Sequence, residues 1–262
     1  KFAAKAKVIH LDIDAAEVGK RKPAKASLIA DLKTSLPALE CVVTPKAWCD
    51  TNKLMSEKHA WRYDYPGEKV FAPYLLNQLS QRMPKTGVVC CDVGQHQMWV
   101  AQHMKFNHPS NHLSSGGAGT MGFGLPAAIG AQVARPDDFV ITVSGDGSIM
   151  MNIQELATIR RNNLPVTILI LDNQRLGMVR QWQQLFFDKR YASTEMTNPN
   201  FVAIAEGYHI QAKKVTKRED LAPALKRALD SGKTACVNVK AKGVISPIVA
   251  AVSDKRDKAS IE

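Results

Sequence analysis

The sequence predicts an α/β fold, in which an open and mainly parallel β-sheet has helices on both faces. Two apolar, β-branched runs at residues 139–143 and 166–171 have the composition of buried strands. Each run is followed by a segment that begins a helical pattern of apolar residues. Each run also ends at small or polar residues, and in open parallel sheets such strand ends line the ligand crevice.

Length, composition and charge narrow the class of protein. The 262 residues provide enough apolar content for a core, in one large or two small domains. No apolar run approaches the roughly 20 residues that a membrane-spanning helix needs. The formal charge of +11 comes from Lys and Arg that are spread along the chain without a dense run or interleaved aromatic residues. We therefore expect a solvated basic surface and neither nucleic-acid binding nor a membrane partner.

Cysteine usage and the amino-terminal residues indicate the cellular context. The five cysteines, at positions 41, 49, 90, 91 and 236, show no Cys-x-x-Cys spacing. We expect neither a disulfide framework nor a zinc site, and a reducing cytoplasm fits this usage. The first residues contain no initiating Met and no signal-peptide core, so we expect the sequence to be the middle of a longer chain.

The first 70 residues are predicted to lie outside the main domain. Residues 1–40 contain an alternating strand at 7–14 and a short helix at 32–39, which is too little mass for a core. Residues 41–70 form a polar connector. Its aromatic residues, which we expect to pack against a neighbouring domain, are Trp48, Trp61, Tyr63 and Tyr65.

The main domain is predicted to cover residues 71–245. An amphipathic helix begins near Pro73, as helix starts prefer, and the sheet begins with a strand at 87–92. After the central strands, helix, strand, helix and strand follow at 201–207, 212–215, 220–229 and 235–239. Residues 246–262 form a charged tail.

Gln95 and His96 follow the strand at 87–92. Gly94 relaxes the turn before them, so both side chains are expected to face the same crevice as Asp146. A lone histidine on such an edge is more often structural than functional, because neutral imidazole is an adaptable hydrogen-bonding group.

A glycine-rich loop occupies residues 114–126. Gly117, Gly119 and Gly122 fit the dinucleotide pattern G-x-G-x-x-G, which requires an apolar strand directly before it. The preceding residues are Asn-His-Pro-Ser-Asn, so we reject a nicotinamide site. Within the loop, Met121 alone would be interpreted as a core residue at a helix start.

Asp146 and Asn173 come at the ends of the two central strands. They are 173 − 146 = 27 positions apart, which leaves room for a turn, a helix, a loop and one adjacent parallel strand. Both side chains could then reach one cation, and magnesium prefers such hard oxygen ligands together with phosphates. The helix start after Asp146 would favour an anion. Either tripeptide alone, Gly-Asp-Gly or Asp-Asn-Gln, would usually be a turn.

The joint pattern resembles a known family. Gly-Asp-Gly at 145–147 followed by Asp172-Asn173 resembles the thiamine diphosphate motif, and the surrounding sequence resembles the large catalytic subunit of acetohydroxyacid synthase, also called acetolactate synthase. The resemblance covers most of the chain and is strongest from about Trp61 to Tyr191. That family usually has Asn-Asn where this chain has Asp172-Asn173, and its ligand is the second residue.

The resemblance implies a thiamine diphosphate-binding fold and a set of site residues. Magnesium would be held by Asp146, Asn173 and the backbone carbonyl of Arg175. Met121 would wedge beneath the cofactor, Met178 would support its thiazolium side and Trp182 would govern acceptor choice. The implied cofactor-binding residues are Gln95, His96, Gly119, Met121, Gly145, Asp146, Gly147, Ser148, Asn173, Gly177 and Met178.

The implied reaction joins pyruvate to a second 2-oxo acid, pyruvate or 2-oxobutyrate, with loss of CO2, in branched-chain amino acid biosynthesis. The implied cofactors are thiamine diphosphate and Mg, with FAD only in a full-length enzyme, because residues 1–40 resemble the end of an FAD-type domain. The capping role of the family's carboxyl-terminal segment is in doubt, since residues 246–262 diverge. The resemblance fits the cytoplasm of bacteria or an organelle of eukaryotes.

One part of the implied machinery has no counterpart in this sequence. The family's catalytic glutamate lies in a pyrimidine-binding domain. Glu155 is the nearest candidate by sequence, but it follows Asp146 on the diphosphate side, so we do not assign it that role. We expect the chain to need that domain, from the same or another chain, in a homo-oligomer with a small regulatory subunit as a further partner. Another thiamine diphosphate carboligase or decarboxylase, and a noncatalytic cofactor-binding module, remain the alternatives.

Overall fold

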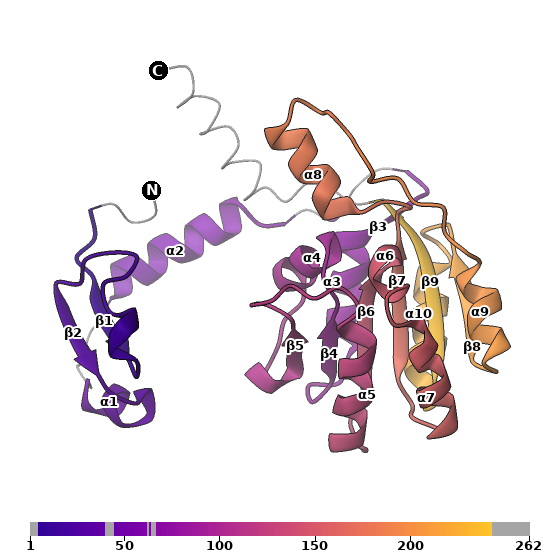
Figure 1. The fold of residues 1–262 in the computed structure, drawn as a ribbon, viewed down its shortest axis with the longest axis horizontal. Coiled ribbons are helices and arrows are strands. Elements are labelled where there is room, and N and C mark those ends of the chain that lie inside the picture. The colour runs from indigo at the N-terminus through magenta and orange to yellow at the C-terminus, as the bar shows by residue number, and fades with distance from the viewer. Residues whose placement is uncertain (1–4, 40–44, 62, 64–66, 243–262) are drawn as a thin grey trace. The chain divides into compact units, whose positions relative to one another are not determined.

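The computed structural model describes residues 5–39, 45–61, 63 and 67–242, and the chain forms two compact units, Lys1–Trp61 and Arg62–Glu262. Figure 1 shows both. The predicted tail at 246–262 lies outside the described residues. No described helix is long and apolar enough to cross a membrane.

The first unit contains a two-stranded parallel sheet and two α-helices. Strand β1 (Ile9–Asp12) pairs with β2 (Ala26–Ile29), the turn η1 (Ala15–Glu17) lies between them, and α1 (Leu32–Ala38) follows. The predicted strand and short helix are confirmed. The second strand and α2 (Lys46–Lys58), which lies in the predicted connector, were missed.

The missed helix α2 has little sequence signal for a helix with a buried face. It has no side-chain cap at its start and no buried residue, and Trp48 is 69% exposed. Among the described residues of the first unit, only Ser35 is buried. The described residues of this unit therefore form no apolar core, as its small mass led us to expect.

The second unit is built on a seven-stranded sheet in which the order is β3-β9-β7-β6-β4-β5, with β8 also paired to β9. All pairings within it are parallel. The predicted open parallel sheet is confirmed. The strands are β3 (Val70–Phe71), β4 (Val88–Cys91), β5 (His112–Ser114), β6 (Val140–Gly145), β7 (Thr167–Asp172), β8 (Gln211–Val215) and β9 (Ala235–Lys242).

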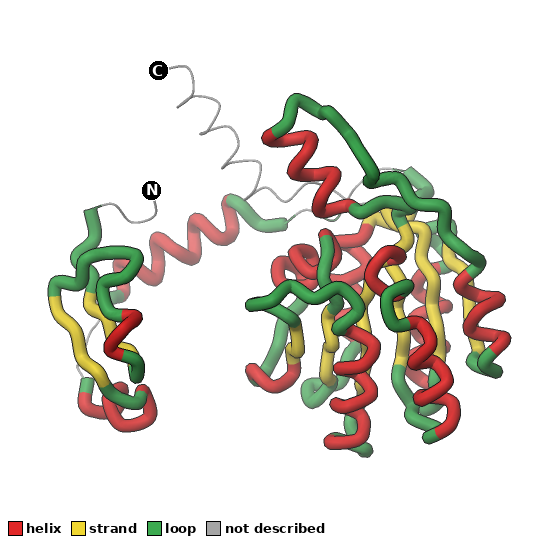
Figure 2. The backbone as a smooth tube through the Cα atoms, viewed as in Figure 1, coloured by secondary structure: helices red, strands yellow, loops and turns green. Residues whose placement is uncertain are grey.

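Figure 2 shows helices on both faces of this sheet. Each face has its own apolar cluster. One cluster packs α3 (Ala72–Arg82), α4 (Gln95–His103) and α10 (Leu221–Asp230) against the sheet. The other cluster packs helices on the opposite face, namely α5 (Gly124–Ala134), α7 (Leu156–Arg161) and α9 (Phe201–Gly207).

The connections around β4 create a crevice at the carboxyl ends of the strands. From β4 the chain passes through α4 to β5 on one side, and it then returns through α5 to β6 on the other side of β4. Strand order thus reverses between β4 and β6, and ligands of open α/β sheets bind at such a reversal. The residues that follow these two strands are therefore placed to form a site.

Two local features differ from the prediction. The helical pattern after Ser148 is broken into α6 (Asp146–Ile149), η3 (Ile153–Glu155) and α7, because Asn152 turns aside to donate to the carbonyl of Gly122 at 2.9 Å. The glycine-rich loop does follow a strand, since β5 ends at Ser114. This short strand, which we did not predict, is the half-buried sequence His-Leu-Ser and is not apolar, so the ground for rejecting a nicotinamide site is unchanged.

Candidate functional site

A cavity of about 170 Å3 lies at the carboxyl ends of β4, β6 and β7, and we call it the central cavity. All residues that the sequence predicts as cofactor or magnesium contacts line it. They are Gln95, His96, Gly119, Met121, Gly145, Asp146, Gly147, Ser148, Asn173, Arg175, Gly177 and Met178. Residues from four separate stretches of sequence are thus brought to one place by the strand order.

His96 is held between two glycines at the start of α4. A Cβ at Gly94 would lie 2.8 Å from its Cε1 atom, and one at Gly145 would lie 2.8 Å from its Nδ1 atom. Gly94 also has a φ of +153°, which side chains rarely adopt. Glycine at these two positions is therefore what lets the imidazole pack between β4 and β6.

The environment of His96 keeps its ring neutral. Burial lowers the pKa of His96 to about 4, and a hydrogen bond with the backbone of Asp92 offsets only part of that effect. Its Nε2 atom is buried and has no hydrogen-bond partner among the described residues. His96 thus offers a polar atom at the central cavity without adding charge at neutral pH.

Gln95 joins the start of α4 to helix α8 (Gly177–Phe186). Its Nε2 donates to Oε1 of the buried Gln181 at 2.8 Å. A Cβ at Gly177 would lie 2.7 Å from Gln95 Oε1 and 3.0 Å from Asn173 Nδ2, so a larger residue would displace these two side chains. The pair fixes the direction in which Gln95 faces the central cavity.

The glycine-rich loop is fastened to the sheet by Asp92, a residue we did not select as a site residue. Asp92 is fully buried, and its Oδ1 accepts hydrogen bonds of 2.8 Å from the N–H groups of Val93 and Gly122. Its Oδ2 accepts from Ser144 Oγ at 2.9 Å. These bonds hold the loop that carries Met121 against β4 and β6.

Asp146 begins the short helix α6 and is 2% exposed. Its Oδ2 accepts hydrogen bonds of 2.7 Å from the N–H of Gln174 and from Nδ2 of Asn198. Burial raises the pKa of Asp146, the Asn198 bond lowers it, and the charge of Asp172 raises it further. A bound cation would offset the cost of this buried charge.

The loop after β7 brings Asn173 and Arg175 to the same cavity. Asn173 Oδ1 accepts from the N–H of Arg175 at 3.0 Å, and Gln174 between them has a left-handed φ of +57°. On the neighbouring strand end, Ser148 Oγ donates to the carbonyl of Val93 at 2.5 Å. The first bond fixes the turn that contains Asn173 and Arg175, and the second fixes the residues that follow Asp146.

The donor set suits magnesium better than a transition metal. The described part of the chain contains no cluster of three His, Cys, Asp or Glu residues that could hold a metal ion. Asp146, Asn173 and the Arg175 carbonyl are hard oxygen donors, and magnesium completes such a set with phosphate oxygens and water. The residues present therefore fit magnesium bound together with a diphosphate.

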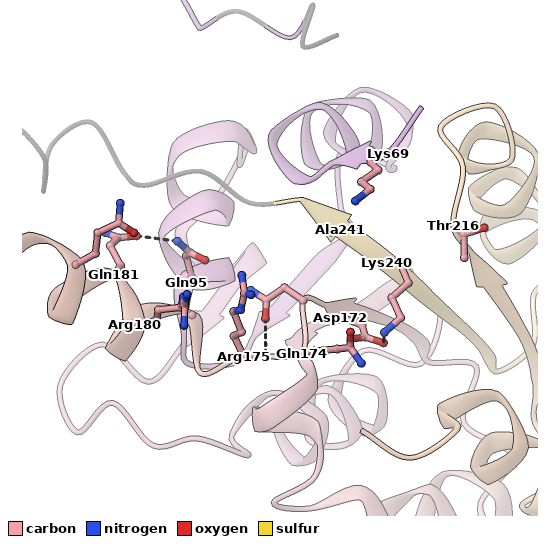
Figure 3. A pocket seen from close by; sticks show the side chains of 13 residues that line it. Lys69, Gln95, Asp172, Gln174, Arg175, Arg180, Gln181, Thr216, Lys240 and Ala241 are labelled. Atoms are coloured by element: carbon pink, nitrogen blue, oxygen red, sulfur yellow. Dashed lines mark hydrogen bonds and ion pairs between the residues drawn. The ribbon is translucent and has the colours of Figure 1, made fainter. Parts of the chain in front are cut away.

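A second, larger recess of about 680 Å3 adjoins the central cavity and shares Gln95, Asn173, Arg175 and Gly177 with it. Four cationic residues line this recess, namely Lys69, Arg175, Arg180 and Lys240. In Figure 3, Lys240 faces the carboxylate of Asp172, and the two groups form an ion pair of 2.8 Å.

Trp182 does not line the central cavity. Its side chain is 50% exposed on α8, one helical turn from Met178, which does line the cavity. The role of Trp182 in acceptor choice stays a prediction. Glu155 does not line the cavity either, and its Oε2 accepts from Thr158 Oγ1 at 2.7 Å.

The sequence interpretation missed Asp92 and Asn198. Asp92 ends a predicted strand, and its position before Val-Gly-Gln-His was the available signal. Asn198 lies in a polar segment, Thr-Asn-Pro-Asn at 197–200, with no helical or strand period. Nothing in that local sequence indicates that its side chain reaches Asp146.

Comparison with known sequences gives a family for this geometry. A sequence model described as "Thiamine pyrophosphate enzyme, C-terminal TPP binding domain" matches residues 92–239. This range includes all the predicted cofactor and magnesium residues that line the central cavity.

Individual relatives match over a wider range. The acetolactate synthase isozyme 2 large subunit of Escherichia coli K12 is 52% identical over 231 residues, which cover 88% of this chain and 42% of that protein. The chloroplastic acetolactate synthase 2 of Nicotiana tabacum is 42% identical over 251 residues, covering 88% of this chain and 37% of the relative. The chloroplastic acetolactate synthase of Arabidopsis thaliana is 40% identical over 247 residues, covering 88% and 37%. The chain thus spans less than half the length of these relatives.

Proposed function

The chain belongs to the thiamine pyrophosphate enzyme family, and from this premise we propose that it is the diphosphate- and magnesium-binding part of an acetolactate synthase. The observation that carries the proposal is the central cavity, where residues from four stretches of sequence converge on one strand-order reversal. The proposed reaction joins pyruvate to a second 2-oxo acid with loss of CO2.

In this proposal the protein binds and orients the cofactor, which supplies the electron sink for decarboxylation and carbon–carbon bond formation. Asp146, Asn173 and the carbonyl of Arg175 hold magnesium. Gln95 and His96 contact the diphosphate through uncharged polar groups. The magnesium ion then carries the main charge compensation, because the pKa of His96 is lowered to about 4 and its imidazole is neutral at pH 7.

The apolar wall of the cavity has a separate role. Met121, on the glycine-rich loop, and Met178, in the first turn of α8, both line the central cavity and would contact a bound cofactor. Thioether side chains are flexible and polarizable, so they would fill irregular gaps beside the cofactor. They also exclude water from the reacting atoms. Trp182, farther along α8, is proposed to select the acceptor.

The proton chemistry at the aminopyrimidine is proposed to come from elsewhere. Among the described residues that line the central cavity, none is a glutamate. We assign that role to a pyrimidine-binding domain, of the same or another chain, in a homo-oligomer. Residues 1–40 are proposed as the end of an FAD-type domain, and a small regulatory subunit is a further proposed partner. The bacterial and chloroplastic relatives fit a cytoplasmic or an organellar setting.

The test is the effect of Asp146→Ala on binding of thiamine diphosphate, measured by calorimetry with and without MgCl2. We expect the magnesium-dependent part of binding to be abolished, because the variant lacks the buried carboxylate ligand. Asp137→Ala removes an exposed carboxylate from a turn and serves as the matched control. Equal affinity of the Asp146 variant and the wild type would remove Asp146 from the metal site.

A further inference from the structure

Asn198 lies outside the stretches that predict the site, yet its side chain contacts two carboxylates there. Its Nδ2 group donates to Asp146 Oδ2 at 2.7 Å and to Asp172 Oδ1 at 2.9 Å. One amide NH2 group has two hydrogens, so it can satisfy both acceptors at once. Asn198 thus bridges acidic side chains from the ends of two neighbouring strands, β6 and β7.

The position of Asn198 is set by the backbone. An antiparallel bridge and two backbone hydrogen bonds of 2.9 Å join residues 194–196 to residues 174–176, which follow Asn173. Glu195 in this segment also forms an ion pair with Arg175, with an Nε–Oε2 distance of 3.2 Å. The loop with the predicted metal ligands therefore holds the segment that ends at Asn198.

The hydrogen bonds of Asp146 distinguish its two oxygens. The backbone N–H of Gln174 and the side chain of Asn198 both donate to Oδ2, each at 2.7 Å. A carboxylate oxygen has two lone pairs, so these two donors fill Oδ2, and a cation would bind Asp146 through Oδ1. We infer that Asn198 is a positioning residue that orients Asp146 as a magnesium ligand through one oxygen, an inference that rests on the proposed function.

Asp172 explains why a neutral amide suits this position. Asp172 is 3% exposed and already forms an ion pair of 2.8 Å with Lys240 (Figure 3). A cationic side chain at position 198 would compete with the metal for Asp146, whereas a carboxylate there would repel both acidic groups. The neutral amide joins the two carboxylates without adding charge, so a bound metal ion would be the group that neutralises Asp146.

The unpaired end of the Asn198 amide argues against a role in packing alone. Its Oδ1 atom is buried and has no hydrogen-bond partner among the described residues. A buried acceptor without a partner is costly, and a leucine of similar volume would avoid that cost. The two Nδ2 bonds are therefore the reason for an asparagine here.

The experiment measures the magnesium dissociation constant of the whole 262-residue chain at saturating thiamine diphosphate. Asn198→Leu keeps the volume and removes both donated bonds, and we expect at least about tenfold weaker binding, as for other residues that orient metal ligands. Asn198→Ser keeps one donor and should lose less affinity. Wild-type affinity in the leucine variant would overturn the inference.

A matched control separates orientation of Asp146 from general stability. Asn200→Ala removes the cap of α9, where Asn200 Oδ1 accepts from the N–H groups of Val202 and Ala203, without touching Asp146. We expect this control to lower the melting temperature and to keep the magnesium affinity. If the Asn198→Leu variant lowers only the melting temperature and keeps the magnesium affinity, as the control does, Asn198 is structural and the inference fails.

A cofactor-free measurement keeps the inference separate from the proposed function. Wild-type protein that binds no magnesium with thiamine diphosphate would contradict the proposed function. In that case, NMR of the cofactor-free protein tests whether Asn198 bridges Asp146 and Asp172. The side-chain amide signals of Asn198 are identified by their loss in the Asn198→Ser spectrum. Slow exchange and a changed shift in Asp146→Asn would support this bridge, whereas fast exchange and an unchanged shift would overturn it.

Discussion

Gly145 shows how the absence of a side chain builds the site. A Cβ at this position would lie 2.8 Å from Nδ1 and 2.9 Å from Cε1 of His96. The same ring lies 2.8 Å from where a Cβ at Gly94 would be, so it is packed against both glycines. The Gly-Asp-Gly sequence therefore serves His96 as well as Asp146.

Gly145→Ala is predicted to lower the free energy of unfolding by about 1–3 kcal/mol, because the added methyl group overpacks a buried ring. It should also weaken binding of thiamine diphosphate, since His96 would be displaced from the central cavity. Urea unfolding and calorimetry measure the two effects.

The control for this substitution is Gly130→Ala. Gly130 is an exposed residue of α5, and a Cβ there would meet no atom within 4 Å. Alanine is a better helix former than glycine, so we expect this variant to be more stable by about 0.5–1 kcal/mol. A Gly145→Ala protein as stable as the Gly130→Ala protein would contradict the close packing of His96.

The lowered pKa of His96 predicts a dependence of stability on pH. The pKa is about 4 in the folded protein and 6.5 for an ordinary histidine, so between these values the unfolded chain binds the extra proton. Stability is therefore present above pH 6.5 and is lost as the pH falls toward 4, by about 3 kcal/mol for this group. Urea unfolding at several pH values measures the loss.

His96→Gln should reduce this pH dependence, because the variant has no imidazole to protonate on unfolding. Part of the dependence should remain, since burial also lowers the pKa of His103, to about 4, and that of His112. His108→Gln removes an exposed imidazole and provides the comparison. An unchanged slope in the His96 variant would show that this ring is not buried in its neutral form.

At the residue scale, sequence predicts the groups that directly follow a strand. Gln95, Asp146 and Asn173 each lie within a few residues of a strand end, so the parallel sheet alone brings them to one edge. Asn198 could not be found this way, because its place depends on the pairing of residues 194–196 with 174–176. Such tertiary pairing leaves no periodic pattern in the sequence.

At the scale of elements, strand and helix predictions hold where apolar periodicity reflects packing against the sheet. The strands β4, β6 and β7 and the helices α3, α9 and α10 were predicted for this reason. The short strands β3 and β5 were missed because two or three residues carry no period. The broken helix after Ser148 was missed because its interruption depends on contact with the distant glycine-rich loop.

Helix α8 differs from the other long helices of the second unit because it lies beyond the carboxyl ends of the strands (Figure 1). Gln181 is its only buried residue. Several large apolar side chains on and after it are exposed by 40% or more, namely Val179, Trp182, Phe187 and Tyr191. An amphipathic helix in this position presents apolar surface next to the central cavity, where a substrate would approach.

Trp182→Leu is predicted to shift the acceptor preference from 2-oxobutyrate toward pyruvate. The assay uses the chain supplied with a pyrimidine-binding domain and measures the ratio of acetohydroxybutyrate to acetolactate. We expect about a tenfold change, the size that small differences in apolar contact produce. Phe187→Leu removes an equally exposed aromatic ring that does not line the cavity, and an effect no larger than in this control would exclude Trp182 from acceptor choice.

At the scale of the whole chain, the apolar core belongs to the second unit. All buried apolar side chains of the described residues lie between Val70 and Val239, and all of them except Phe71 belong to the two clusters on the faces of the large sheet. The first unit has a two-stranded sheet, and its residues Ile9, Ile13 and Trp48 are each about 70% exposed. A two-stranded sheet without an apolar core is marginal in water.

Removal of residues 1–61 is therefore predicted to change the free energy of unfolding of the remaining protein by less than about 1 kcal/mol. At this size 1 kcal/mol corresponds to a shift of about 2–4 °C in melting temperature, which calorimetry resolves. The isolated fragment 1–61 should show no cooperative transition, because a chain of this length without a core cannot offset its conformational entropy. A large loss of stability in 62–262 would mean that the first unit contributes to the core, and a sharp transition in 1–61 would mean that it folds alone.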